Sequence, residues 1–499
     1  MSARLSTFCA TAAIAAAMTF GPAAAKEAGT LVVVQEAEPV GLDLMRSSIQ
    51  TTMNVGYNIH DTLFEPKEDA SIGPRLAEKW EKLSDTSWKI YLRKGATFHD
   101  GTPVTAEAVK FSFDRIRDEK LQSPNRSKVT AFTDLKVIDD HTFTISTAEP
   151  YAPGLYMLAY YLPIIPPEQV KKAGDDGYNT KPVGSGPYKV VRWVRGEEVV
   201  LEAHKGYYGP KPAYDKVIFR AVPDESARVA ALLTGEADVV SGIPMHQRKR
   251  VEESKKAYLT DQMGNMPYLG LNTYKPPFND KRVRQAVNYA INRELINKAL
   301  FQNKALLAKG AFSPRTFGHD PSLKGYAYDP AKAKALLKEA GLESGFDVKL
   351  SYPTYIPQIQ EQAEAIVADL AKVGIRATLE PLERAVMWDN YKAGKQQMYI
   401  YWWDDAPDPD RYIYPLLNSK SRDYYYKNAE LDALLDKART VTDRAEREKI
   451  YQAADRMIYE DAPWAFLYII PEVFGVANDV QYQGRRDGFL DMRTAKPKA

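Results

Sequence analysis

Two tryptophans and four aspartates lie close together in the segment WWDDAPDPDRYIY, from Trp402 to Tyr414. A carboxylate is costly to remove from water unless it gains a partner, whereas an indole ring is costly to leave in water. A segment that combines them indicates a surface that holds a charged group against an apolar wall. The chemistry expected of these aspartates is the binding of a cation, with the capping of turns or of the next helix as the structural alternative.

Patterns typical of catalysis or of a metal site are not found in the sequence. The six histidines are scattered, without H-x-x-x-H or H-E-x-x-H spacing, and no G-x-S-x-G segment occurs. Acidic residues are abundant, so their number alone does not exclude a pair of catalytic carboxylates such as glycosidases use, although no particular pair stands out. We predict no catalytic residues, no metal site and no cofactor.

The acidic segment directly follows a predicted strand, QMYIYWW, at residues 397–403. Prolines at 407 and 409 prevent the strand from continuing, so the aspartates lie on the loop at its end. Loops at strand ends in α/β lobes are common places for ligands. Side chains alternate across a strand, so one of Trp402 and Trp403 faces the core and the other a cleft; the pattern does not decide which.

Strands and helices alternate over much of the chain. KVIFRAV at 216–222 predicts a strand, Asp224 can cap the helix ESARVAALLT, and Gly235 can end it. The same order recurs in FDVKLSY, EQAEAIVADLAKV and IRATLEPL, between residues 346 and 382. Strands separated by helices of this length predict α/β lobes. At 499 residues, the chain is long enough for two or three lobes with a cleft between them.

The first 25 residues are typical of a secretory signal. Arg4 supplies the positive charge, an apolar run follows, and Ala23-Ala24-Ala25 fits a cleavage site, so the mature chain would begin at Lys26. The single cysteine, Cys9, lies inside the signal, which predicts an exported protein without disulfides and without a lipid anchor. Without Arg4, 66 basic and 65 acidic residues remain, a balance that does not favour nucleic acid or an anionic membrane as a partner.

Five segments in a fixed order resemble the extracytoplasmic solute-binding proteins of ATP-driven (ABC) importers, in family 5, which includes dipeptide, oligopeptide and nickel binders. The segments are LRKGATFHDGTPVTAEAV (92–109), VGSGPYKVVRW (183–193), YLGLNTYKPPFNDKRVRQAVNYAINRELI (268–296), YDPAKAKALLKEAG (328–341) and DDAPDPDRY (404–412). The resemblance covers nearly all of the mature chain.

This resemblance implies a periplasmic-binding-protein-like α/β fold of two lobes joined by a hinge. Lobe I would comprise residues 26–263 and 469–499, with an extra subdomain at 74–181, and lobe II residues 264–468. It also implies a monomer in the periplasm whose partners are its ligand and the permease subunits in the inner membrane.

In peptide-binding members of the family, an aspartate at the position of Asp405 pairs with the α-ammonium group of the ligand. Dipeptide binders also place an arginine in the loop that corresponds to PTYIPQIQ (353–360), where this chain has no basic residue. Tyr352 and Tyr355 would line the pocket instead. Arg46 lies on a first-lobe loop that contacts ligand in relatives, with a surface salt bridge as the alternative.

Tyr268 and Asn272 flank the expected first crossing between the lobes and could belong either to the hinge or to the pocket. The functional prediction is a periplasmic receptor that captures a peptide or peptide-like solute and delivers it to a permease. A non-peptide ligand (an opine, a sugar-like compound or a metal chelate) stays open within the same role. A secreted hydrolase and a periplasmic chaperone are the alternatives from other classes.

Overall fold

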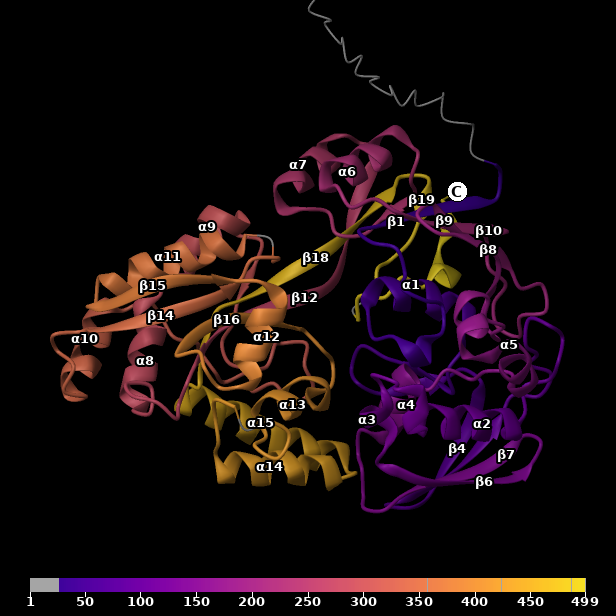
Figure 1. The fold of residues 1–499 in the computed structure, drawn as a ribbon, viewed down its shortest axis with the longest axis horizontal. Helices are drawn as coiled ribbons and strands as arrows, with labels where there is room; N and C mark the ends of the chain where they lie inside the picture. The colour runs from indigo at the N-terminus through magenta and orange to yellow at the C-terminus, as the bar shows by residue number, and fades with distance from the viewer. Residues whose placement is uncertain (1–26, 357, 423, 486, 499) are drawn as a thin grey trace, which may run out of the picture.

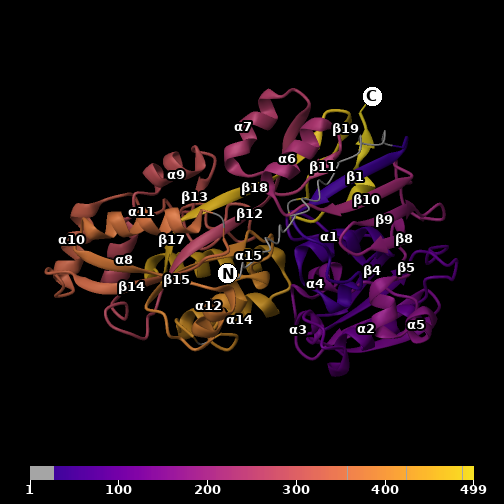
Figure 2. The same cartoon turned by 45° about the horizontal axis from the view of Figure 1, so that its top comes forward.

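The computed structural model describes residues 27–498, apart from residues 357, 423 and 486. The predicted signal, with Cys9 and the expected start at Lys26, lies outside the described residues. Two α/β lobes lie beside each other, and two long strands cross between them (Figures 1 and 2). The predicted fold class is confirmed. In the part of the chain that is described, every helix is too short or too polar to cross a bilayer.

Lobe I has a parallel centre with antiparallel strands at its edge. Its strands are β1 (Thr30–Gln35), β8 (Tyr188–Val194), β9 (Glu198–Ala203), β10 (Lys216–Ala221) and β11 (Val239–Val240). Its helices are η1 (Leu44–Arg46), α1 (Gln50–Ile59), α6 (Glu225–Thr234) and α7 (Met245–Glu253). The Asp224 side chain accepts a hydrogen bond from the main-chain N of Ala227, and Gly235 ends α6 with a φ of 84°. This stop turns the chain back so that β10 and β11 both run parallel to β1.

An extra subdomain is inserted into lobe I, and its four-stranded antiparallel sheet has the order β4-β5-β7-β6. The sheet is formed by β4 (Ala77–Ser84), β5 (Ser87–Leu92), β6 (Phe132–Asp139) and β7 (Thr142–Thr147). A separate antiparallel pair, β2 (Phe64–Pro66) and β3 (Ile72–Pro74), precedes it, ahead of the boundary expected at residue 74. The helices of the subdomain are α2 (Ala106–Arg117), η2 (Glu119–Leu121), α3 (Arg126–Val129), α4 (Gly154–Tyr161) and α5 (Pro167–Thr180). The Thr105 hydroxyl caps α2 by accepting a hydrogen bond from the main-chain N of Ala108.

Lobe II repeats the alternation of strand and helix and adds a helical layer below its sheet in Figure 1. Its strands are β13 (Leu306–Leu307), β14 (Phe346–Pro353), β15 (Ile375–Leu382), β16 (Met398–Asp404) and β17 (Trp464–Phe466). Its helices are α8 (Lys281–Ala290), α9 (Arg293–Phe301), α10 (Pro330–Glu339), α11 (Ile359–Ala371), α12 (Arg384–Lys392), η3 (Pro409–Arg411), α13 (Ile413–Leu417), α14 (Ala429–Thr440) and α15 (Arg444–Asp461). A tail of β19 (Val480–Gln481), η4 (Met492–Thr494) and β20 (Lys496–Pro497) returns to lobe I.

The two crossing strands are β12 (Ala257–Leu271) and β18 (Tyr468–Ala477). They pair with each other, while β12 also pairs with β16 of lobe II and β18 with β11 of lobe I. One sheet therefore runs through both lobes, in the order β15-β14-β16-β12-β18-β11-β1-β10-β9-β8. The boundaries expected at 263/264 and 468/469 fall within β12 and at the start of β18.

The lobe II end of β12 depends on a close approach between Gly270 and the ring of Tyr399 in β16. A Cβ atom added at Gly270 would lie 2.1 Å from Cζ of this fully buried tyrosine. Because a fixed aromatic ring in a packed core cannot yield by that amount, the position excludes any side chain.

We predict that Gly270→Ala lowers the free energy of unfolding by about 1–3 kcal/mol, since overpacking forces the β12–β16 pair apart. Urea unfolding of the whole chain measures the change. Gly177→Ala on α5 is the control, because its added Cβ would make only an ordinary contact at 3.4 Å. Equal stability of the two variants would contradict this account of the packing.

Candidate functional site

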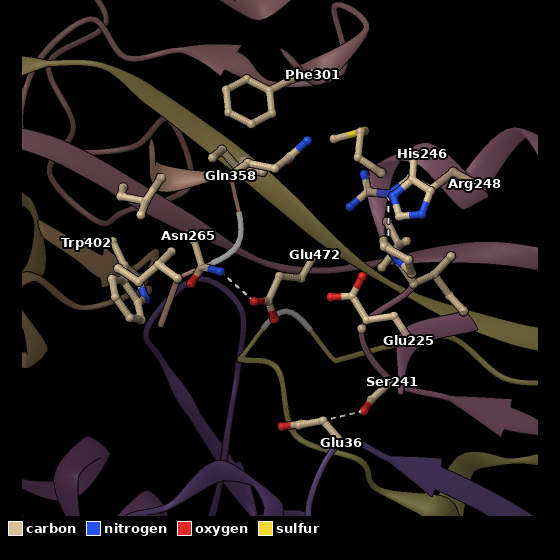
Figure 3. A pocket seen from close by; sticks show the side chains of 18 of the residues that line it. Glu36, Glu225, Ser241, His246, Arg248, Asn265, Phe301, Gln358, Trp402 and Glu472 are labelled. Carbon is tan, nitrogen blue, oxygen red and sulfur yellow. Dashed lines mark hydrogen bonds between the residues drawn. The ribbon is translucent and has the colours of Figure 1, made fainter. Parts of the chain in front are cut away.

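A cavity of about 550 Å³ lies between the lobes, beside the two crossing strands (Figure 3). We call it the interlobe cavity. Lobe I contributes α1, the loop after β1 and the segment from Pro223 to Arg248, and lobe II contributes Phe301, the start of α11 and Trp402. The crossing strands contribute Asn265 and Glu472, among others. Its size and its walls on both lobes are typical of a small-molecule site.

Three carboxylates reach this cavity from three different elements: Glu36 after β1, Glu225 in the first turn of α6, and Glu472 on β18. Figure 3 shows them around the same space. Glu36 accepts a hydrogen bond from Ser241 Oγ at 3.0 Å. Glu472 accepts one from Asn265 Nδ2 at 2.5 Å, which joins the crossing strands through their side chains.

Glu472 has an unusual acidity for a glutamate. Burial raises the pKa of its carboxyl to about 7, and the nearby charges of Asp404 and Glu36 add to this effect. The hydrogen bond from Asn265 and the charge of Arg248 oppose it. Near neutral pH this carboxyl is therefore close to half-protonated, and a cation in the cavity would stabilise its ionised form.

Asp404 ends β16 and does not itself line the cavity; the residue reaches solvent, but protein atoms surround its carboxyl. Burial raises the pKa of its carboxyl, and the charge of Arg411 opposes the shift. The segment 402–414 therefore has a carboxyl near enough to Glu472 to raise the pKa of that glutamate. The residue that has this effect is Asp404, the neighbour of the Asp405 that the resemblance implies.

Two arginines also line the cavity. Arg228 donates to the carbonyl oxygens of Val222 and Pro223 at 2.9 and 2.8 Å, and Arg248 donates to that of Pro471 at 2.7 Å. These bonds hold both guanidinium groups against the lobe I wall. Their charges offset part of the negative charge that the carboxylates bring.

The aromatic wall of the cavity comes from Trp402. Its ring centroid lies 5.7 Å from that of Tyr355 and 5.5 Å from that of Tyr401. Trp403 points to the opposite face of β16 and lines a small apolar pocket with Tyr268 and Trp464. The alternation expected from the sequence is thus resolved: Trp402 faces the interlobe cavity.

Asp405 lies behind the lobe II wall and is not among the residues that line the cavity. Its side chain is only 4% exposed and accepts hydrogen bonds from the hydroxyls of Ser313 and Thr316. Its main-chain N donates to the carbonyl of Gly264 at the hinge, at 2.8 Å. These contacts fix the loop at the end of β16.

The other residues expected at the site are spread over the molecule. Asn272 is buried and donates to the carbonyls of Gly394 and Gln396. Tyr268 lies on β12, stacked on Trp464 at 4.2 Å.

Tyr352 is 4% exposed and packs in the lobe II core, whereas Tyr355 is exposed beside Trp402. Arg46 pairs with Asp176 on the lobe I surface at 2.8 Å, which is the alternative considered for it. The structure therefore places Trp402 in the cavity wall with Tyr355 beside it, and the other expected residues do not line the cavity.

Sequence reasoning did not select Glu36, Glu225 or Glu472. A signal for Glu472 existed, because a glutamate in the apolar strand YIIPEVFGVA needs an explanation. Nothing in the sequence shows that the loop after β1 and the start of α6 face that strand.

Comparisons with known proteins agree with this architecture. Residues 71–424 match the family described as bacterial extracellular solute-binding proteins, family 5 Middle. The chain belongs to this family. A dipeptide-binding protein of Escherichia coli K12 is 32% identical over 482 residues, which cover 88% of this chain and 89% of that protein. A glutathione-binding protein of Pectobacterium atrosepticum is 31% identical over 476 residues, which cover 91% of each.

Among solved structures, a periplasmic binding protein from Helicobacter pylori in complex with the peptide STSA aligns with a TM-score of 0.79 and 28% identity. The alignment covers 94% of this chain and 98% of that one. Family 5 consists of solute-binding receptors, so the predicted recognition is confirmed and the class of protein is a receptor.

The raised pKa of Glu472 predicts how stability depends on pH. Between about pH 4.5 and 7 the folded chain binds more protons at this group than the unfolded chain does, so the free energy of unfolding falls as the pH rises. We predict that the free energy of unfolding of the unmodified chain falls by roughly 1–3 kcal/mol between pH 5 and pH 8 because of this group. In Glu472→Gln, which imitates the protonated form, this decrease should be absent.

Urea unfolding at both pH values tests this, with the exposed Glu448→Gln on α15 as the matched control. If the two variants show the same pH dependence as the unmodified chain, Glu472 titrates normally and the electrostatic account of the cavity is wrong.

Proposed function

We propose that this protein is the receptor of an ABC importer, and that it captures a peptide or peptide-like solute with a free ammonium group in the interlobe cavity. The observation that carries the proposal is the gathering of Glu36, Glu225 and Glu472 around a cavity with walls on both lobes. A solute that contacts both walls binds the closed form best and therefore favours closure of the lobes.

The cavity supplies what such a ligand needs. A carboxylate that is partly in contact with water can exchange that water for an ammonium group at modest cost. Trp402 and Phe301 offer apolar surface for the side chains of a peptide. We propose Glu472 as the main partner of the ammonium group, because it stands between the lobes and because its acidity responds to a cation.

Asp405 is the competing choice for this role, on the strength of the family motif. Its carboxylate is buried, accepts hydrogen bonds from the hydroxyls of Ser313 and Thr316, and does not line the cavity, so this choice requires a rearrangement of the lobe II wall. The absence of a basic residue in the segment 353–360 makes a peptide held through its terminal carboxylate at that loop less suitable.

An opine or sugar-like ligand is the second candidate, since the amides of Gln50, Asn54, Gln358 and Gln362 also line the cavity. Side-chain amides suit hydroxyl groups as well as peptide groups. We further propose that the receptor works as a monomer in the periplasm after removal of residues 1–25, and that it delivers its solute to permease subunits in the inner membrane.

Calorimetry with trialanine and N-acetyl-trialanine tests the ammonium site. We expect acetylation to weaken binding to the unmodified chain by roughly 10- to 100-fold, as for the loss of a hydrogen bond to a charged group. Glu472→Gln should cause a similar loss for trialanine and add little once the amine is acetylated. Asp405→Asn, in contrast, should leave the ratio of the dissociation constants of the two peptides unchanged.

The outcomes separate the alternatives. If Asp405→Asn abolishes the discrimination and Glu472→Gln does not, the motif assignment is correct and ours is wrong. If the free and acetylated peptides bind the unmodified chain equally well, or neither binds, a solute without an ammonium group becomes the better choice.

A further inference from the structure

A second contact between the lobes lies away from the crossing strands, where the extra subdomain meets the helical layer of lobe II. Tyr151 of lobe I donates its hydroxyl to Asp410 Oδ2 at 3.0 Å. In lobe II, Arg439 at the end of α14 pairs with the other oxygen of Asp410 at 2.8 Å. The main-chain N of Ala152 donates to the carbonyl of Arg439 at 2.6 Å. In Figures 1 and 2, α14 lies next to α3 of the subdomain.

These groups are removed from water. Tyr151 is 7% exposed and Asp410 is 6% exposed. The guanidinium of Arg439 also lies over the Tyr151 ring, 4.9 Å from its centroid, so the tyrosine makes contact through both its hydroxyl and its ring. Hydrogen bonds between a hydroxyl and a buried carboxylate are strong, and an unpaired buried carboxylate is costly.

Weaker contacts surround this one. Arg411 of lobe II lies 4.5 Å from the centroid of the Tyr160 ring of lobe I. At the rim, Thr442 Oγ1 donates to Asp85 Oδ1 at 3.2 Å. None of these residues lines the interlobe cavity, so none of them is placed to touch a solute there.

We propose that Tyr151, Asp410 and Arg439 form a latch that holds the closed arrangement and thereby sets the affinity for any solute. They are positioning residues. The lobes are joined by β12 and β18, so a rotation about these strands would separate the Tyr151 hydroxyl from the Asp410 carboxylate. The contact therefore stabilises the closed form relative to the open form. Because affinity scales with the population of the binding-competent form, loss of the latch weakens binding without altering a single solute contact. This inference rests on the proposed capture by closure but not on the chemistry of the solute.

The test measures closure without any solute. Asp85→Cys and Thr442→Cys place two thiols across the rim, and a short bis-maleimide joins them when the lobes are closed. The only cysteine of the sequence, Cys9, lies in the predicted signal, so the mature chain offers no competing thiol. When opening and closing are fast, the rate of cross-linking follows the closed population.

Into this background we introduce Tyr151→Phe, which keeps the ring and removes the hydroxyl. We expect cross-linking to slow by roughly 10- to 100-fold, as for the loss of a hydrogen bond to a charged group. Tyr178→Phe is the matched control, because its buried hydroxyl donates within lobe I, to the Val183 carbonyl at 2.6 Å. It should leave the rate unchanged.

A second variant, Arg439→Met, tests the contact from the lobe II side and should also slow cross-linking. Thermal unfolding of each variant shows that both lobes remain folded. Unchanged cross-linking in Tyr151→Phe and Arg439→Met, or an equal loss in Tyr178→Phe, would overturn the latch. A failure of trialanine to bind would contradict the proposed solute and leave this result as it stands.

Discussion

The pairing of β12 with β18 is the interaction on which the rest of the structure depends. Each strand belongs to the sheet of both lobes, so the lobes are connected by hydrogen-bonded backbone and not by loose linkers. Two paired strands resist stretching and shear but can twist and bend. The two strands therefore keep the lobes connected while the angle between the lobes can change, which a cleft that opens and closes requires.

The position of Glu472 follows from the same pairing. A carboxyl on one of these strands has protein on both sides when the lobes are together, and its pKa rises for that reason. The side chain of Asn265 on the neighbouring strand keeps it in place. An electrostatic response to a bound cation is therefore located on the crossing strands themselves. The contact at Tyr151 acts at the other end of the interface and affects the closed form as a whole.

Local chemistry explains why the sequence predicted so much of the fold. Asp224, Gly235 and Thr105 act on their own helices, and the apolar strands can be recognised by their composition. Helix ends and strands can therefore be predicted without knowing which other segments they pack against. The order of five segments then pointed to the family. The site was harder to predict, because it is formed by Glu36, Glu225 and Glu472, which are far apart in the chain. Asp405 shows the limit most clearly: its motif is recognisable, but its contacts with Ser313 and Thr316 depend on a loop 90 residues earlier.

Native mass spectrometry of freshly purified mature protein tests the central claim most directly, because it needs no assumption about the solute. We predict a bound small molecule that carries a free amino group, present on the unmodified chain and largely lost from Glu472→Gln. An anionic solute, or a solute retained equally by both chains, would contradict the claim that the interlobe cavity captures its ligand through the hinge carboxylate.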